Sequence, residues 1–252
     1  MGRKSIATTV LGVAGLLILA SMANAAEIKV LASNAIKEAY LELVPGFEKA
    51  TEHKVTTTWA GTNDIMKRMQ AGETFDLVIM AGPSIDELAK QGKIAAGSRV
   101  DLAKSGVGVA VRAGAPRPDI SSGDALMRAL LAAKSIAYSS GPSGVYLAGL
   151  FQRMGIADEI KPKIKQTAPG SPVGEVIARG EAEIGFQQIS ELLPVVGIDY
   201  LGPLPADIQQ ITVFSGGIHT GAKEPDAAKA LVKFITAPAA VPVIKKKGME
   251  PG

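Results

Sequence analysis

The sequence contains no cysteine, and aromatic residues make up only 4% of it. Without cysteine there is no disulfide framework and no lipid-modified N-terminal cysteine. Histidine is scarce too, since His53 and His219 are the only two. Neither has an Asp, Glu or His partner at the spacing of metal ligands, so we expect no metal site. The absence of cysteine suits an oxidising compartment outside the cytoplasm.

Motifs of cofactor and nucleophile chemistry are also missing. There is no Gly-Lys-Ser/Thr phosphate loop, and Gly106-Val107-Gly108 lacks the third glycine of a dinucleotide loop. The run Gly141–Val145 lacks the second glycine of a nucleophile elbow. The sequence therefore predicts no cofactor, and it favours ligand binding over catalysis.

The N-terminus has the pattern of a cleavable export signal. Basic residues Arg3 and Lys4 precede an apolar run at Val10–Ala20, and Ala23-Asn24-Ala25 offers small residues where a signal peptidase reads them. The apolar run is shorter than the roughly 20 residues that span a bilayer. We therefore expect residues 1–25 to be a signal peptide, and the exported chain to have no membrane anchor.

Charge gives no sign of a nucleic-acid partner. The chain has 27 Lys and Arg against 24 Asp and Glu, and two of the basic residues lie in the leader. The exported chain is thus close to neutral, whereas nucleic-acid-binding domains carry a clustered basic surface. We expect no nucleic acid to bind.

Short apolar runs alternate with segments of helical periodicity through the rest of the chain. Repeated strand–helix–strand units of this kind predict an α/β fold, with mostly parallel sheets flanked by helices. Between the first two runs, Ile36, Tyr40, Leu43 and Phe47 recur at helical spacing. The expected strands are Glu27–Ala32, Lys54–Ala60, Phe75–Ala81, Val107–Arg112, Ser135–Ser139, Glu183–Gln187 and Ile211–Ile218.

Two proline-containing stretches, Arg112–Ser122 and Leu201–Gln209, interrupt this rhythm beside predicted strands. We interpret them as the places where the chain passes from one lobe to the other and back. The prediction is a first lobe of residues 26–109 and 211–252, and a second lobe of residues 110–210. Two crossings form a two-strand hinge, which lets the lobes close around a ligand.

Polar residues gather where predicted strands end and helices begin. These corners are Ala32–Ala35, Ala60–Asp64, Ser139–Gly144 and Ser171–Val173. Unpaired N–H groups at a helix start carry about half a positive charge and can hold an anion. The same residue types are ordinary helix caps. Capping and anion binding therefore both remain open at each corner.

Five stretches cover nearly all of the exported chain: Lys29–Phe47, WAGTND (59–64), AGETFDLVIMAGPSIDELAKQGKI (71–94), GPSGVYLAGLFQRMGIADEIKPKI (141–164) and GEVIARGEAEIGFQQISEL (174–192). In order and spacing they resemble the periplasmic molybdate-binding protein family. The resemblance implies a type II periplasmic-binding-protein fold, a periplasmic location and an inner-membrane ABC permease as partner. It also implies a tetrahedral oxyanion, such as molybdate or tungstate, held by hydroxyls and backbone N–H groups.

The family's ligand positions can be carried over one by one. Its second-strand serine falls on Thr62, which keeps a hydroxyl, and its tyrosine falls on Gln188. Its first-strand serine falls on Ala35, just after Ser33 and Asn34. Its two N–H ligands in the other lobe fall on Ser143 and Val173. The resemblance thus implies ligand binding by Ser33, Asn34, Ala35, Gly61, Thr62, Ser143, Val173 and Gln188.

Two functions lead because two family hydroxyls are replaced, and a binding module that signals through a partner is a third possibility. The leading expectation is a monomeric solute-binding protein that captures a small anion, either an oxyanion or an organic carboxylate, for an ABC importer. The alternative is an isomerase similar to aconitate isomerase, which resembles this family and shifts a double bond in a tricarboxylate. Proton abstraction would need a base near the cleft, and the candidates are Asp64, Glu175 and Glu191.

Overall fold

The computed structural model describes residues 25–252, so the expected signal peptide lies outside the described residues except for Ala25. The first part of the chain alternates strands and helices. These are β1 (Glu27–Ser33), the short 3₁₀ helix η1 (Asn34–Ile36), α1 (Lys37–Thr51), β2 (Lys54–Ala60), α2 (Thr62–Gln70), β3 (Leu77–Ala81) and α3 (Gly82–Lys90).

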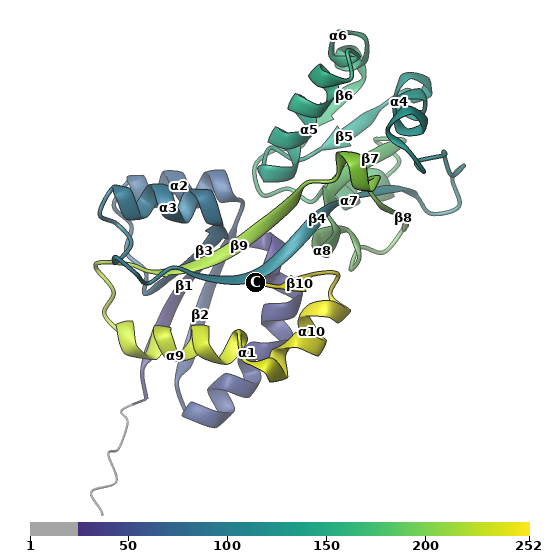
Figure 1. Cartoon of the computed structure of the whole chain (residues 1–252). Coiled ribbons are helices and arrows are strands. Elements are labelled where there is room, and N and C mark those ends of the chain that lie inside the picture. The colour runs from purple at the N-terminus through teal and green to yellow at the C-terminus, as the bar shows by residue number, and fades with distance from the viewer. Residues whose placement is uncertain (1–24) are drawn as a thin grey trace, which may run out of the picture.

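A long strand, β4 (Val100–Arg112), leads into the second part of the chain, and β9 (Ile211–Ile218) leads back (Figure 1). Between them lie α4 (Gly123–Ala132), β5 (Ile136–Tyr138), α5 (Pro142–Arg153), α6 (Ala157–Ile160), η2 (Lys161–Lys163), β6 (Ile164–Gln166), α7 (Val173–Ala178), β7 (Ile184–Gln188), α8 (Ile189–Leu192), β8 (Ile198–Pro203) and η3 (Ala206–Ile208). After β9 come α9 (Pro225–Ile235), η4 (Pro238–Ala240), α10 (Val241–Lys246) and β10 (Glu250–Pro251).

The strands follow one another in the order β2-β1-β3-β9-β4-β7-β5-β6. The strands of the strand–helix–strand units are parallel, as expected: β1 with β2 and β3, and β5 with β6 and β7. The two long connecting strands run antiparallel to their neighbours, so each sheet is mixed. Residues 100–106 of β4 pair with β9, and residues 107–111 pair with β7. One strand therefore belongs to both sheets.

Helices cover both faces of each sheet, which explains why the central strands read as continuous apolar runs. Alternate residues of β3 point to opposite faces. Leu77 and Ile79 pack with α1, α9 and α10, while Val78 and Met80 pack with α2 and α3. In the second part, Val107, Val109 and Val111 of β4 join a core with α4, α5 and α6. We call the two parts the first and second lobe, and their predicted boundaries remain predictions.

The structure differs from the expected elements where strands are short or polar. The strand β4 begins at Val100, whereas the sequence predicted a start at Val107. Several of its first residues are exposed or charged, so their pattern did not indicate a strand. Leu201–Pro203, expected in a connecting stretch, belongs to β8, which pairs with β4. Among residues 25–252 no single helix is long and apolar enough to cross a membrane. Only α9 taken together with the segment 238–246 passes that test, as a pair bent by 55°.

Candidate functional site

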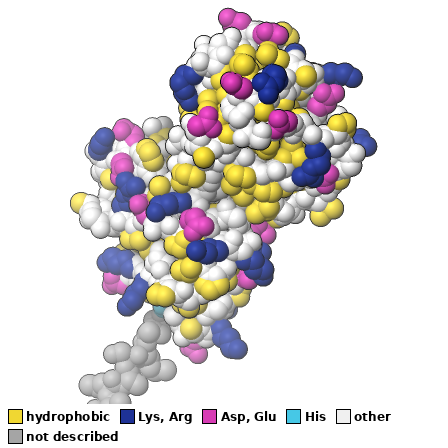
Figure 2. Space-filling view, turned by 45° about the vertical axis from the view of Figure 1, so that its right-hand side comes forward, with side chains coloured by type: hydrophobic (Ala, Val, Ile, Leu, Met, Phe, Trp, Pro, Cys, Tyr) yellow, Lys and Arg dark blue, Asp and Glu magenta, His cyan; other side chains and the backbone are white. Residues whose placement is uncertain are grey.

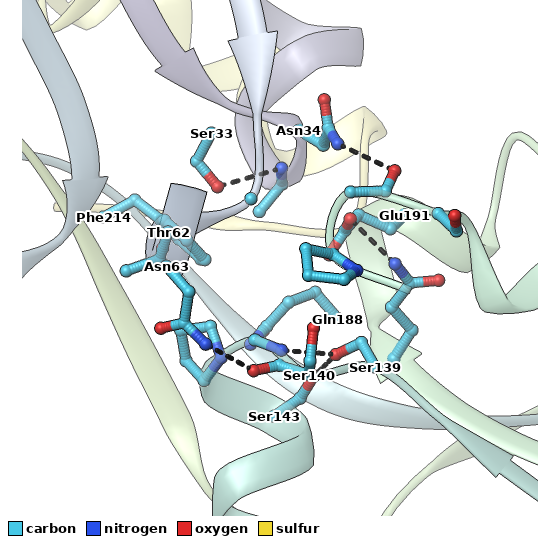
Figure 3. A pocket seen from close by; sticks show the side chains of 18 residues that line it. Ser33, Asn34, Thr62, Asn63, Ser139, Ser140, Ser143, Gln188, Glu191 and Phe214 are labelled. Carbon is cyan, nitrogen blue, oxygen red and sulfur yellow. Dashed lines mark hydrogen bonds between the residues drawn. The ribbon is translucent and has the colours of Figure 1, made fainter. Parts of the chain in front are cut away.

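One pocket is lined by residues from both lobes (Figure 3). Seven of the eight ligand-binding residues predicted from the sequence line it, coming from the ends of β1, β2 and β7 and the start of α5. These ends meet because parallel strands present their carboxyl ends at one edge of a sheet. The seven are Ser33, Asn34, Ala35, Gly61, Thr62, Ser143 and Gln188.

The eighth residue, Val173, is not part of the pocket lining. Its side chain is fully buried in a small core of the second lobe. Its backbone N–H donates a 2.8 Å hydrogen bond to Oε1 of Gln187, the residue before Gln188. The N–H that the resemblance assigned to a ligand is therefore engaged within the protein.

The start of α2 presents a hydroxyl to which the described part of the chain offers no hydrogen-bond partner. Gly61 is the N-cap residue of this helix and has no side chain to satisfy the first N–H groups, and Thr62 is the first helical residue. Thr62 is only 5% exposed, and within residues 25–252 its Oγ1 has no hydrogen-bond partner. An unsatisfied buried polar group costs about 1–3 kcal/mol. A ligand in the pocket would remove that cost.

The start of α5 forms the opposite wall. Gly141 is its N-cap residue, and the hydroxyls of Ser139 and Ser143 lie 3.2 Å apart. The Gly141 N–H donates to Ser139 Oγ at 3.3 Å. A Cβ at Gly144 would lie 1.5 Å from the Ser139 carbonyl oxygen, so only glycine allows the helix to begin this close to the end of β5.

Gln188 stands where the family resemblance expected a tyrosine. Its side chain is 1% exposed, and its Nε2 donates to Thr212 Oγ1 on β9 at 3.0 Å. Its Oε1 is buried without a partner among the described residues. A hydroxyl can donate as well as accept, so a half-turn of the amide keeps the Thr212 contact and offers an N–H donor to the pocket.

The structure separates the three candidate bases. Glu175 is exposed and pairs with Arg179 at 3.7 Å, and Asp64 does not line the pocket. Glu191, on α8, does line it and accepts a 2.9 Å hydrogen bond from Gln187 Nε2. Burial raises the pKa of the Glu191 carboxyl to about 7, although the bond from Gln187 lowers it. A carboxyl that titrates near neutrality is suited to both accepting and returning a proton.

Two side-chain amides close the mouth of the pocket. Asn63 of α2 donates to the Ser140 carbonyl at 2.8 Å, and Asn34 donates to the Gly170 carbonyl at 3.4 Å. Both bonds join the first lobe to the second. The structure is therefore a closed form, in which the loop around Gly170 lies against the start of α2.

The electrostatics of the pocket come from neutral donors. Within the described chain, its lining contains no Lys, Arg or His, and Glu191 is its one acidic residue. No cluster of residues 25–252 could hold a metal ion. On the face shown in Figure 2, acidic and basic side chains are interspersed over both lobes, and hydrophobic side chains gather near its centre. An anion in the pocket would be held by hydroxyls, amides and backbone N–H groups, without a salt bridge.

Sequence reasoning did not single out several lining residues. Asn63, Ser139 and Ser140 lie within corners that the strand-end pattern had marked, so a signal for them existed. Gln187 and Phe214 also line the pocket. They lie inside predicted strands rather than at the polar corners. Nothing in the sequence therefore distinguished them from ordinary strand residues.

A two-lobed α/β fold with a pocket between the lobes, lined by helix starts, defines a class of ligand-capturing proteins. The chain belongs to the family of bacterial extracellular solute-binding proteins, which matches residues 28–250. Among solved structures, the periplasmic molybdate-binding protein of Azotobacter vinelandii superposes with a TM-score of 0.75 at 21% identity, over 89% of this chain and 99% of that one. The fold is thus the type II periplasmic-binding-protein fold, as the resemblance implied.

Two curated relatives cover most of this chain and carry different functions. The aconitate isomerase of a Pseudomonas species is 41% identical over 228 residues, which are 88% of this chain and 87% of that protein. The molybdate-binding protein ModA of Azotobacter vinelandii is 30% identical over 240 residues, 92% of each chain. The chain is therefore a divergent relative of the molybdate-binding proteins.

Proposed function

We propose that this chain is an isomerase that binds a small tricarboxylate between its lobes and moves one of its protons with Glu191. The observation that carries the proposal is the position of this carboxyl. It is the single acidic side chain, within the described residues, in a pocket otherwise lined by uncharged donors. Anion capture alone does not require a carboxyl there, because its ionised form repels the ligand, whereas proton transfer requires a base.

The remaining lining residues suit a ligand with several carboxylates. The starts of α2 and α5 direct backbone N–H groups and partial positive charge at the pocket from opposite lobes. Thr62 Oγ1 and the Gln188 amide each have unused hydrogen-bonding capacity. We expect the lobes, residues 26–109 with 211–252 and residues 110–210, to close around such an anion.

The reaction needs only a proton shift. The Glu191 carboxylate takes a proton from a CH₂ group next to a substrate carboxylate, and the C–H electron pair enters the carbon framework. The double bond moves, and the charge spreads onto carboxylate oxygens that the helix starts stabilise. The Glu191 carboxylic acid then returns the proton to the former alkene carbon. Nothing is oxidised or reduced, and the base is regenerated.

The relative that is 41% identical supports the choice of substrate, because it is an aconitate isomerase. The test is to incubate the purified protein with cis-aconitate or trans-aconitate and to follow the two isomers by proton NMR. The proposal predicts approach to the same isomer ratio from either side. Saturating binding without any interconversion would overturn it.

The second candidate is a periplasmic receptor that delivers an anion to an ABC permease after removal of residues 1–25. Membership of the solute-binding family and the 30% identical molybdate-binding relative favour it. A thermal-shift series with molybdate, tungstate, sulfate, phosphate, citrate and both aconitates discriminates the two. Stabilisation by molybdate or tungstate, with no isomerisation of aconitate, would support the receptor.

A further inference from the structure

Gln187 occupies an unusual position between the start of α7 and the proposed base. It is 4% exposed and lies on β7, where it pairs with Gly108 of β4. Both ends of its side-chain amide are used, by Val173 N–H at one end and by Glu191 Oε1 at the other. The side chain therefore joins a fixed backbone donor to a titratable carboxyl.

The orientation of this amide is determined by its anchor. A backbone N–H can only donate, so the atom that faces Val173 must be the amide oxygen. The NH₂ group therefore faces Glu191 and can only donate to it. Glu191 Oε1 is thus an acceptor in both protonation states, and the exchangeable proton of the neutral carboxyl belongs on Oε2.

We propose, on the basis of the proposed isomerase function, that Gln187 is a positioning residue that keeps Glu191 Oε1 as an acceptor and reserves Oε2 for the transferred proton. The amide also favours the carboxylate over the acid, because its N–H bond strengthens when the acceptor is charged. Its bond from Val173 polarises the amide and strengthens the N–H donor further. Gln187 thus offsets part of the rise that burial causes in the pKa of Glu191.

The test follows the titration of the Glu191 carboxyl by infrared spectroscopy. The signal of this carboxyl is obtained by subtracting, for the wild type and for each variant, the spectrum of the same protein that also carries Glu191→Gln. This readout needs no substrate, so it stands even if the protein fails to isomerise aconitate. Gln187→Met keeps the length of the side chain and removes the donor. We expect the titration midpoint of Glu191 to rise by about one pH unit, since a hydrogen bond to a charged group contributes about 1.5–3 kcal/mol. An exposed control, Gln152→Met, should leave the midpoint unchanged.

Gln187→Glu is the second variant, because its carboxyl can still accept from Val173 N–H and so preserves the anchor. Two adjacent carboxyls share a proton, so we expect two separated titrations in place of one. If the protein is active, the acidic limb of its pH–rate profile should shift with the infrared midpoint. A folded Gln187→Met protein with an unchanged midpoint, or a Gln187→Glu protein with one unshifted titration, would overturn the positioning role.

Discussion

Asn63 and Ser140 come from different lobes and meet at the mouth of the pocket, where the Asn63 side-chain amide donates to the Ser140 carbonyl at 2.8 Å. Asn63, on α2, and Ser140, two residues before α5, lie 77 positions apart in the chain. Because this bond and the bond from Asn34 to the Gly170 carbonyl both join the two lobes at the pocket, each contributes directly to the balance between the open and closed forms. Closure in turn decides whether the pocket excludes water from a bound ligand.

Asn63→Ala should shift the chain towards the open form. A hydrogen bond of this kind contributes about 0.5–1.5 kcal/mol, so we expect ligand affinity to fall about 2- to 10-fold while the melting temperature changes little. Small-angle scattering of the ligand-free protein should report a larger radius of gyration. Gln70→Ala, at the exposed far end of the same helix, is the matched control. Equal radii of gyration for the wild type and Asn63→Ala would contradict the proposed role of this hydrogen bond in holding the lobes closed.

Thr62→Val separates binding from stability. The hydroxyl of Thr62 is buried and has no partner among residues 25–252, so its removal should leave the free energy of unfolding unchanged or raise it by up to about 1 kcal/mol. Ligand affinity should nevertheless drop about tenfold, as measured by calorimetry. Thr57→Val is the control, because Thr57 Oγ1 bonds the Tyr40 hydroxyl at 3.0 Å. That variant should lose stability and keep affinity, and the same behaviour in Thr62→Val would show that Thr62 does not contact the ligand.

Gly144 and Gly149 lie on the same helix and should respond oppositely to substitution by alanine. A Cβ at Gly144 meets the Ser139 carbonyl oxygen at 1.5 Å, whereas a Cβ at Gly149 meets only the Arg153 side chain, at 3.4 Å. Gly149→Ala should stabilise the protein by about 0.5–1 kcal/mol, because alanine is the better helix former. Gly144→Ala should lower the melting temperature and abolish ligand binding, since the wall of the pocket must shift. If neither substitution changed the melting temperature or ligand binding, the close packing of Gly144 against Ser139 would be contradicted.

The stability of the protein should depend on pH through Glu191. Burial raises the pKa of its carboxyl from about 4.5 to about 7, so the folded chain holds this proton more tightly than the unfolded chain. Stability is therefore fully present below pH 4.5 and falls as the pH rises to 7. Glu191→Gln should be more stable than the wild type by about 2 kcal/mol at pH 8, after allowance for partial exposure, and the gain should shrink towards pH 4. Urea unfolding at both pH values checks this, and a gain that does not change with pH would refute it.

Much of the fold could be predicted because its signals are local. The strands β2 and β9 were predicted at their full length, since each is an apolar or β-branched run between turn residues. The beginning of β4 was missed because Asp101 and Lys104 look like loop residues until a partner strand is known. The strands β6 and β8 are short and partly exposed, and they are held by pairing with distant strands rather than by their own pattern.

The candidate site divides in the same way. Thr62 and Ser143 could be predicted because strand ends and helix starts are visible in the sequence, and both line the pocket. Val173 N–H could not be excluded in advance, because its partner Gln187 lies on another element. Glu191 was one of three equal candidates until the packing of α8 distinguished it from the exposed Glu175. Which polar group is buried depends on tertiary packing, and spacing does not report that.

The most direct test of the account compares the turnover of aconitate by the wild type and by Glu191→Gln, with binding to each protein verified by calorimetry. The account predicts that the wild type interconverts the isomers, with kcat/KM rising through about pH 7 as Glu191 loses its proton. Glu191→Gln should bind the tricarboxylate within a few-fold of the wild type and turn it over about 10²- to 10⁴-fold more slowly. Equal turnover by the two proteins, or none by either despite tight binding, would contradict it.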